Sequence, residues 1–251
     1  MTLNYANYNW FTLPKWTETC AIVDSAMVAM QLYTYTNSPD YLIFVNRVYL
    51  NAIRTAQRDC GGAGCETCAT SESPEIKMFM YEAFFCCTMR ITEGLNALVN
   101  FQLIRDNNNL IIPFHSSFEA KLDEAIIKVT TKGIYGHKKI QINLTNTKGI
   151  NSLKIYIPKN SRVICSEQYT QTDNFVVIYN FENKILLDII CEPVKESLLN
   201  ADIYRLGDIL LARRNNNAVG EFYHINGQDY YPLINMMQLS KEETENIVQS
   251  L

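Results

Sequence analysis

Apolar residues in the first hundred positions recur at the spacing of helices. Between Ala21 and Leu32 they cover nearly every face of one segment, which predicts a helix that is buried on most sides. A second helix is expected to start in the stretch "NSPDY", with Ser38 as its N-cap and Pro39 at the first helical position. Another apolar run at helical spacing begins at Ile91. The pattern therefore predicts three or four helices before residue 106.

The period changes to two after the polar stretch "RDNNN" at 105–109. Apolar residues alternate with polar ones in 139–144 and 153–157, and the segments 175–179 and 184–190 predict further short strands. Turn residues such as Lys148 and Gly149 separate these runs. Several short strands at such regular spacing are typical of an antiparallel sandwich.

The two patterns together predict an α+β chain with more than one domain. Residues 1–106 are expected to hold the helices and residues 107–239 the β-sandwich. The remaining stretch, 240–251, has Ser240 as a plausible N-cap followed by acidic residues, which predicts a short terminal helix.

Composition narrows the class of protein. The 251 residues are 47% hydrophobic and 19% charged, as in a soluble globular protein, and the net charge of -4 gives no electrostatic reason to expect nucleic acid. No apolar run approaches the roughly 18 residues that a membrane helix needs. The N-terminal stretch also lacks the basic and apolar regions of a signal peptide. We therefore expect a cytoplasmic protein without a membrane partner.

Eight cysteines are more than a structural core requires. In a reducing compartment they indicate metal binding or catalysis and not a disulfide framework. Cys165 and Cys191 lie within or beside β runs and are expected in the core. Cys86 and Cys87 stand side by side in the stretch "FFCCTMR", where neighbouring thiols rarely bond to each other because the small ring is strained.

Two metal-site hypotheses follow from the remaining cysteines. Cys60, Cys65 and Cys68 have the C-x4-C-x2-C spacing of plant-type ferredoxins, which suggests an iron–sulfur or separate zinc site. A glycine-rich loop with incidental reduced thiols is the simpler interpretation, because the flanks are helical and acidic residues are sparse.

The other hypothesis joins the adjacent pair to the stretch "WTETC". Cys20, Cys86 and Cys87 with one carboxylate form a chemically sensible tetrahedral zinc set. Glu18 would then lie beside the metal, where a general acid is useful.

The residues that carry this second hypothesis also carry a resemblance. The stretch from "ETCAIVDSAMVAMQLYTYTNSPDYLIFVNRVYLNAI" to the later "CC", followed by a β region, resembles the β-L-arabinofuranosidases of glycoside hydrolase family 127 and their uncharacterised relatives. The resemblance covers roughly residues 10 to 105, and the β half only in layout. It implies helices of an (α/α)6 barrel that carry the site, followed by a β-sandwich.

The resemblance also implies residue roles and a carbohydrate substrate. Glu18 would act as general acid and base, Cys86 as a zinc-bound nucleophile, and Cys20 and Cys87 as zinc ligands. A retaining glycosidase normally uses two carboxyl groups, and here a thiolate replaces the second one.

Two features depart from the family pattern. No acidic residue precedes Glu18, so the fourth zinc ligand, a glutamate upstream in the family, has no counterpart. The long N-terminal part of the barrel is also missing, so the chain resembles a C-terminal part. Three or four helices cannot close such a barrel, and a partner chain or self-association is expected to cover their apolar faces. Activity of the chain alone stays open, and a non-catalytic carbohydrate-binding or assembly protein with vestigial cysteines is the alternative.

Overall fold

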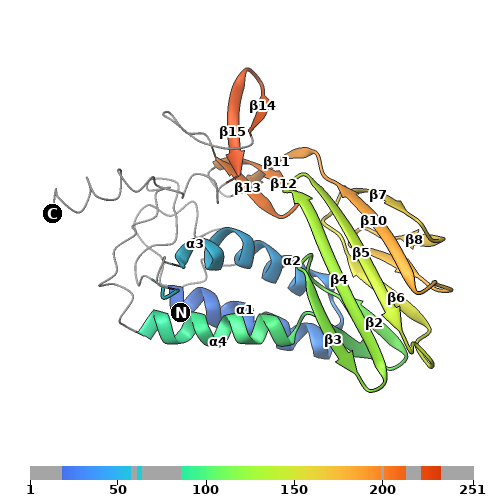
Figure 1. The fold of residues 1–251 in the computed structure, drawn as a ribbon. Coiled ribbons are helices and arrows are strands. Elements are labelled where there is room, and N and C mark those ends of the chain that lie inside the picture. The colour runs from blue at the N-terminus through green and yellow to red at the C-terminus, as the bar shows by residue number, and fades with distance from the viewer. Residues whose placement is uncertain (1–18, 58–60, 64–85, 199–200, 213–221, 233–251) are drawn as a thin grey trace. The chain divides into compact units, whose positions relative to one another are not determined.

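The computed structural model describes residues 19–57, 61–63, 86–198, 201–212 and 222–232. The chain divides into two compact units. One unit joins the chain up to Ala97 with the chain from Pro193 onward, and the other comprises Leu98–Glu192. Each unit has its own secondary structure (Figure 1).

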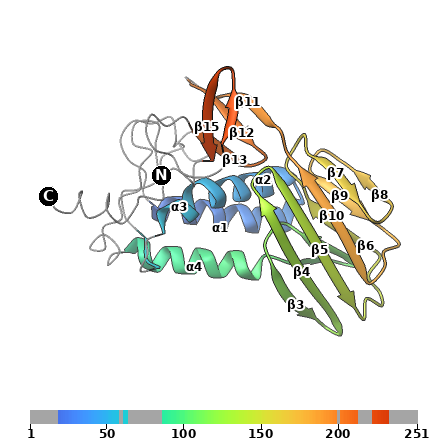
Figure 2. The ribbon, with the colours of Figure 1, turned by 45° about the horizontal axis from the view of Figure 1, so that its top comes forward.

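The first unit contains the helices, and they follow the predicted periodicity. Figures 1 and 2 both show α1 between α4 on one side and the α2–α3 segment on the other. This central place agrees with the apolar residues on nearly all faces of α1. The bounds are α1 Thr19–Thr36, α2 Pro39–Val48, the π-helix η2 Tyr49–Ile53, α3 Arg54–Ala56 and α4 Cys86–Asn100.

The turn between α1 and α2 uses the residues that the sequence indicated. Asn37 adopts a left-handed conformation with φ 55°, and its N–H donates to the carbonyl of Tyr33 at 2.8 Å, which ends α1. Ser38 has extended φ/ψ and precedes Pro39 at the first position of α2. Its place at the N-cap is as predicted, but its hydroxyl makes no capping hydrogen bond.

The second unit is a pair of facing five-stranded sheets. One sheet has the strand order β1-β2-β6-β9-β8 and the other the order β3-β4-β5-β10-β7. Neighbouring strands pair antiparallel except β2 and β6, which are parallel. The bounds of the first sheet are β1 Ile104–Asp106, β2 Asn109–Ile112, β6 Ser152–Tyr156, β9 Phe175–Ile178 and β8 Tyr169–Gln171. Those of the second are β3 Phe118–Leu122, β4 Ala125–Ile134, β5 His137–Thr145, β10 Lys184–Ile190 and β7 Arg162–Cys165.

The core of this unit lies between its two sheets. Alternate residues of the strands point inward, so that β5 contributes Ile140, Ile142 and Leu144, all at most 2% exposed. Residues of β2, β6 and β9 from the other sheet belong to the same buried cluster. The expected β-sandwich is thus present over this part of the chain.

A third sheet belongs to the same unit as the helices. Its order is β11-β12-β13-β15-β14, with bounds β11 Pro193–Leu198, β12 Ala201–Leu206, β13 Ile209–Ala212, β15 Gln228–Pro232 and β14 Tyr223–Ile225. The range 107–239, expected as one β-sandwich, is therefore divided between two units. Buried hydrogen bonds of the Asn51 side chain to Asp208 and Leu210 explain why this sheet goes with the helices.

Charged residues reinforce that attachment. Arg47 on α2 forms ion pairs with Asp208 at 3.5 Å and with Glu196 at 3.7 Å. Glu196 also accepts a hydrogen bond from Arg205 at 2.9 Å. Because the Arg205 and Asp208 side chains are about 5% exposed, these charges are compensated by one another and not by water.

Two further predictions concern the ends of elements. The change of period is confirmed, because α4 ends at Asn100 and β1 begins at Ile104. The terminal helix expected at 240–251 lies outside the described residues.

Within the described part of the chain, no helix combines the length and the apolar character needed to cross a membrane.

Candidate functional site

The thiols of Cys20 and Cys87 meet between α1 and α4. Their Sγ atoms are 2.9 Å apart, although the two residues are 67 positions apart in the chain. Cys87 is completely buried, whereas Cys20 is partly exposed. Both residues are in the thiol form, and each lies one position after the first residue given for its helix.

The two helices run parallel, which brings their first turns together. Along α1 and α4 the contacts advance in the same direction, from Cys20 with Cys87 to Asp24 with Arg90, whose carboxylate and guanidinium are 2.8 Å apart. One turn further along α4, Gly94 packs so closely on Val23 of α1 that a Cβ at position 94 would collide with the valine methyl group. A glycine at this position therefore allows the close helix contact that joins the thiols.

The distance between the thiols is intermediate between two bonded arrangements. A disulfide requires about 2.05 Å between the sulfur atoms. Two thiolates on one tetrahedral zinc, each about 2.3 Å from the metal, would be roughly 3.8 Å apart. The observed 2.9 Å lies about 0.9 Å from either arrangement, so small side-chain rotations of Cys20 and Cys87 reach both.

A neighbouring loop is anchored at the same end of α4. Thr88, next to Cys87, exchanges hydrogen bonds with the backbone of Ala63 at 3.2 and 3.3 Å. Ala63 is fully buried and forms an isolated bridge with Gln57. In the sequence Ala63 lies between Cys60 and Cys65. Thr88 thus ties the short segment 61–63 to the first turn of α4.

The described residues hold only part of the predicted site. Cys20 and Cys87 are brought together, while Glu18, the side chain of Cys86, and Cys60, Cys65 and Cys68 lie outside the described residues. Over the described part, no three His, Cys, Asp or Glu side chains form a group suited to a metal.

Other residues named from the sequence lie in the core or pack against it. Burial is the main cause that raises the pKa of Cys165, which packs with Cys191 against the core of the second unit. The Tyr33 side chain, on α1, is only 2% exposed and belongs to the core of the helices.

Arg90 lies close to the thiol pair and forms an ion pair with Glu93, one turn along α4. Arg90 also reaches Asp24 on α1. The hydrogen bond to Glu93, followed by the charge of Asp24, raises the pKa of Arg90, and the charge of Cys20 acts in the same direction. Arg90 therefore lies close enough to the thiol pair to interact with a thiolate there. The sequence contained one sign that Arg90 would lie near the thiols: it follows Cys87 by three residues, which is about one helical turn.

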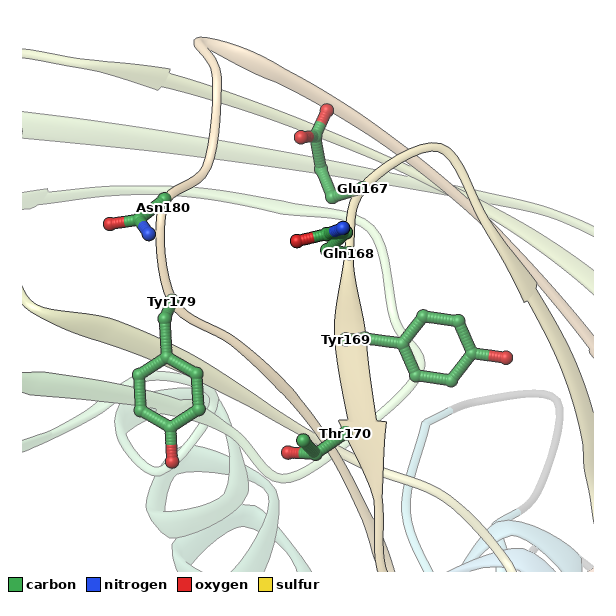
Figure 3. A pocket seen from close by; sticks show the side chains of 6 residues that line it. All are labelled: Glu167, Gln168, Tyr169, Thr170, Tyr179 and Asn180. Atoms are coloured by element: carbon green, nitrogen blue, oxygen red, sulfur yellow. The ribbon is translucent and has the colours of Figure 1, made fainter.

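A second candidate site lies on the sandwich. An open hollow of about 710 Å³ lies between β8 and the residues that follow β9. Figure 3 shows the side chains that line it. Gln168 and Thr170 point toward the segment that carries Tyr179 and Asn180, while the Tyr169 ring points away. Glu167 completes the lining.

The lining is suited to a neutral polar ligand. The Tyr169 hydroxyl donates to the carbonyl of Val163 at 3.0 Å and is thereby held in place. Among the described residues, no hydrogen-bond partner is found for the side chains of Gln168, Thr170, Tyr179 and Asn180. The Tyr179 ring is 55% exposed.

Comparison with known proteins finds similarity in fold and not in sequence. No family model matches the sequence, and neither does any curated protein. Solved structures do match. The crystal structure of a GH127 β-L-arabinofuranosidase from Geobacillus stearothermophilus T6 has a TM-score of 0.58 and 12% identity over 80% of this chain. A second GH127 β-arabinofuranosidase gives 0.57 and 13% over 80%, and a glycoside hydrolase gives 0.64 and 12% over 87%.

The chain shares its fold with part of these glycoside hydrolases. The matches cover 37%, 38% and 44% of the three proteins, so the chain spans about two fifths of their length. The expected resemblance to family 127 is thus confirmed at the level of the fold. The structure also confirms the expected α+β fold, in which helices are followed by mostly antiparallel sheets.

Proposed function

We propose that the chain is the C-terminal part of a glycoside hydrolase that resembles the retaining β-L-arabinofuranosidases and uses a zinc-bound cysteine as its nucleophile. The contact between Cys20 and Cys87 carries this proposal. The family resemblance assigns metal-binding roles to these two cysteines, and the fold brings their thiols within 2.9 Å although they are far apart in sequence.

Each residue of the proposed site has a defined role. Cys20, Cys86 and Cys87 would hold the zinc ion, whose charge would keep the thiols ionised at neutral pH. The Cys86 thiolate would attack the anomeric carbon of a furanoside. Glu18 would donate a proton to the leaving oxygen and later accept one from the attacking water, as the acid and base of a retaining glycosidase does. Arg90, bound to Asp24, would keep a positive charge beside Cys20.

The chemistry of the described donors fits zinc. Thiolates are among the preferred ligands of this metal, and the spacing between Cys20 and Cys87 requires an opening of about 0.9 Å to suit a tetrahedral ion. Cys86 immediately precedes Cys87 in the first turn of α4, so a third cysteine is available from the same backbone segment.

The helices are proposed to be part of an (α/α)6 barrel completed by further helices. On the α1 surface an apolar stripe is exposed to solvent, formed by Val28, Leu32 and Tyr35 with 50%, 37% and 85% exposure. Spacings of four and three residues place them on one face. Because α1 is apolar on nearly all sides, this stripe is expected to be covered by helices of a longer chain or by a second copy.

Metal content tests the proposal. Elemental analysis of the full chain, purified under reducing conditions, should find about one zinc per chain and much less in Cys20→Ser, Cys86→Ser and Cys87→Ser. Cys165→Ser, in the other unit, is the matched control and should keep its zinc. Protein without zinc would contradict the proposed site, and iron with acid-labile sulfide would favour the cluster alternative at Cys60, Cys65 and Cys68.

Hydrolysis of aryl β-L-arabinofuranosides tests the reaction itself. If the chain is active, alone or with a completing partner, Glu18→Gln should lower kcat by roughly 10²–10⁴-fold. An aryl substrate with a good leaving group should be less affected in the first step, because it needs less proton donation. Equal losses for good and poor leaving groups would contradict the assignment of Glu18 as the acid.

The hollow of Figure 3 favours a second candidate function, which is glycan binding by the sandwich. Sugar rings bind to exposed aromatic faces and to amide and hydroxyl groups, and Tyr179, Gln168 and Asn180 offer these groups. Tyr179→Ala should abolish retention on immobilised arabinan in affinity electrophoresis. Tyr35→Ala, which removes an exposed tyrosine of the other unit, is the control, and equal retention of all three proteins would exclude the hollow as the binding site.

A further inference from the structure

The thiols of Cys20 and Cys87 are arranged for oxidation as well as for metal binding. We infer that they form a reversible disulfide, a thiol modification site for which hydrogen peroxide or an organic hydroperoxide is the oxidant. Closing the sulfur atoms from 2.9 Å to about 2.05 Å requires a movement of about 0.9 Å, which is the scale of a small side-chain rotation.

Exposure determines the order of the two steps. Cys20 is partly exposed and meets the oxidant, whereas Cys87 is fully buried and does not. The Cys20 thiolate attacks one oxygen of the peroxide, the O–O bond breaks, and Cys20 becomes a sulfenic acid as the other oxygen leaves as hydroxide. The sulfur of Cys87 then attacks the Cys20 sulfur. The S–S bond forms, the sulfenic hydroxyl leaves, and the Cys87 proton converts it to water.

The balance of the reaction is complete with these partners. The two thiols together lose two protons and two electrons. One hydrogen peroxide is thereby reduced to two molecules of water, and an organic hydroperoxide to one water and one alcohol. A low-molecular-weight thiol reverses the reaction by exchange, because the Cys20 side of the disulfide is accessible from solvent.

The disulfide would have two consequences for the molecule. It would join the first turns of α1 and α4 covalently, next to the ion pair of Asp24 and Arg90. It would also remove both sulfur atoms from any metal, and this second consequence alone rests on the proposed function. Oxidation and zinc binding would then exclude each other at the same two atoms.

Peptide mapping of the wild-type chain tests the inference. The full chain is reduced, freed of metal with a chelator, treated with one equivalent of hydrogen peroxide and alkylated before digestion. We expect a peptide that joins Cys20 to Cys87, two hydrogens lighter than the sum of its parts and absent after reduction. Cys20 and Cys87 both alkylated as thiols, or Cys20 joined to Cys86 or Cys65, would overturn the inference.

Variants test the order of the steps. In Cys87→Ser the sulfenic acid of Cys20 has no resolving thiol and should be captured by dimedone. In Cys20→Ser the buried Cys87 should stay reduced, and Cys165→Ser should form the same link as the wild type. Dimedone capture at Cys87 in place of Cys20 would overturn the assigned order. Should a serine variant fail to fold, the wild-type map decides by itself.

Zinc content separates this inference from the proposed function. A Cys20–Cys87 link in a chain that binds no zinc supports the disulfide and contradicts the metal site. Zinc binding by a chain that forms no link when metal-free supports the metal site and contradicts the disulfide. Protection of both thiols by bound zinc, together with a link in the metal-free chain, supports both.

Discussion

The side chain of Asn51, in the π-helix, is hydrogen-bonded to the backbone of Leu210 in β13. Its Oδ1 accepts from the Leu210 N–H at 2.7 Å, and its Nδ2 donates to the carbonyls of Asp208 and Arg47, also at 2.7 Å. Asn51 is fully buried. One amide group thus satisfies three backbone groups away from water, and the helices and the third sheet depend on it.

Asn51→Ala should lower the free energy of unfolding by about 3 kcal/mol, because buried backbone groups lose their partner. Asn51→Asp should cost at least as much, since a carboxylate keeps the acceptor for Leu210 but faces two carbonyl oxygens. Urea unfolding followed by circular dichroism measures both. Asn96→Ala, on the exposed face of α4, should change stability by less than about 0.5 kcal/mol, and a similar loss there would contradict the assigned role of Asn51.

Gly94→Ala should destabilise the protein although alanine is the better helix former. The added Cβ would collide with the Val23 methyl group, and a β-branched side chain in a helix has little freedom to move. Overpacking of about 1–3 kcal/mol would outweigh the roughly 1 kcal/mol gained in helix propensity.

Val23→Ala provides the matched test, because it removes the methyl groups that the new Cβ would meet. The double variant should be less destabilised than the sum of the two single variants, by about 1 kcal/mol in a urea-unfolding cycle. Additive effects, or a stabilising Gly94→Ala, would show that α1 and α4 do not pack as closely here as described.

His115 should make stability depend on pH. Its Nε2 donates to the Tyr156 carbonyl, and burial, followed by the charge of Lys138, lowers the pKa of His115 to about 3. In the unfolded chain a histidine has a pKa of about 6.5. Between these values the unfolded state binds a proton that the folded state does not, so the free energy of unfolding falls as pH falls. At pH 5, His115 lowers the free energy of unfolding by about 2 kcal/mol relative to its value at high pH.

His115→Gln should remove that part of the pH dependence, since glutamine can donate to Tyr156 but does not titrate. Urea unfolding at pH 7 and pH 5 compares the two proteins. His224→Gln, at an exposed histidine of the other unit, should keep the wild-type difference between the two pH values. An unchanged pH difference in His115→Gln would contradict the lowered pKa.

The apolar stripe of α1 should cause self-association of the purified chain. Leu32→Glu places a charge in the middle of the stripe and should shift the protein to a smaller species in light scattering coupled to size exclusion. Ile164→Glu, at an exposed apolar position of the sandwich, should leave the assembly unchanged. A monomeric wild-type chain at tens of micromolar concentration, about the level at which weak interfaces associate, would show that no second copy covers Leu32.

Local pattern predicted the elements better than their assembly. The strands around Ile140, Leu153 and Leu187 were expected because alternation alone places isoleucine and leucine on one face. The attachment of β13 to the helices was not expected. It depends on the buried side-chain amide of Asn51, and the periodicity of apolar residues gives no sign of that contact.

The candidate site shows the same limit. Residue types at Cys20 and Cys87 indicated metal chemistry, but a distance between two helices cannot be obtained from spacing along the chain. The ion pair of Asp24 with Arg90 could not be predicted because its partners lie on different helices, whereas the pair of Arg90 with Glu93 lies within one turn of one helix.

The division of the chain has a consequence for its synthesis. The unit that contains α1 and β13 is assembled from two segments, and the whole of Leu98–Glu192 lies between them in sequence. A ribosome therefore releases the sandwich as a continuous stretch that can fold as soon as it emerges. The helices must wait, with Asn51 unsatisfied, until β13 has been translated. During that interval the apolar faces of the nascent helices lack their final partners, which is the condition under which chains aggregate or engage chaperones.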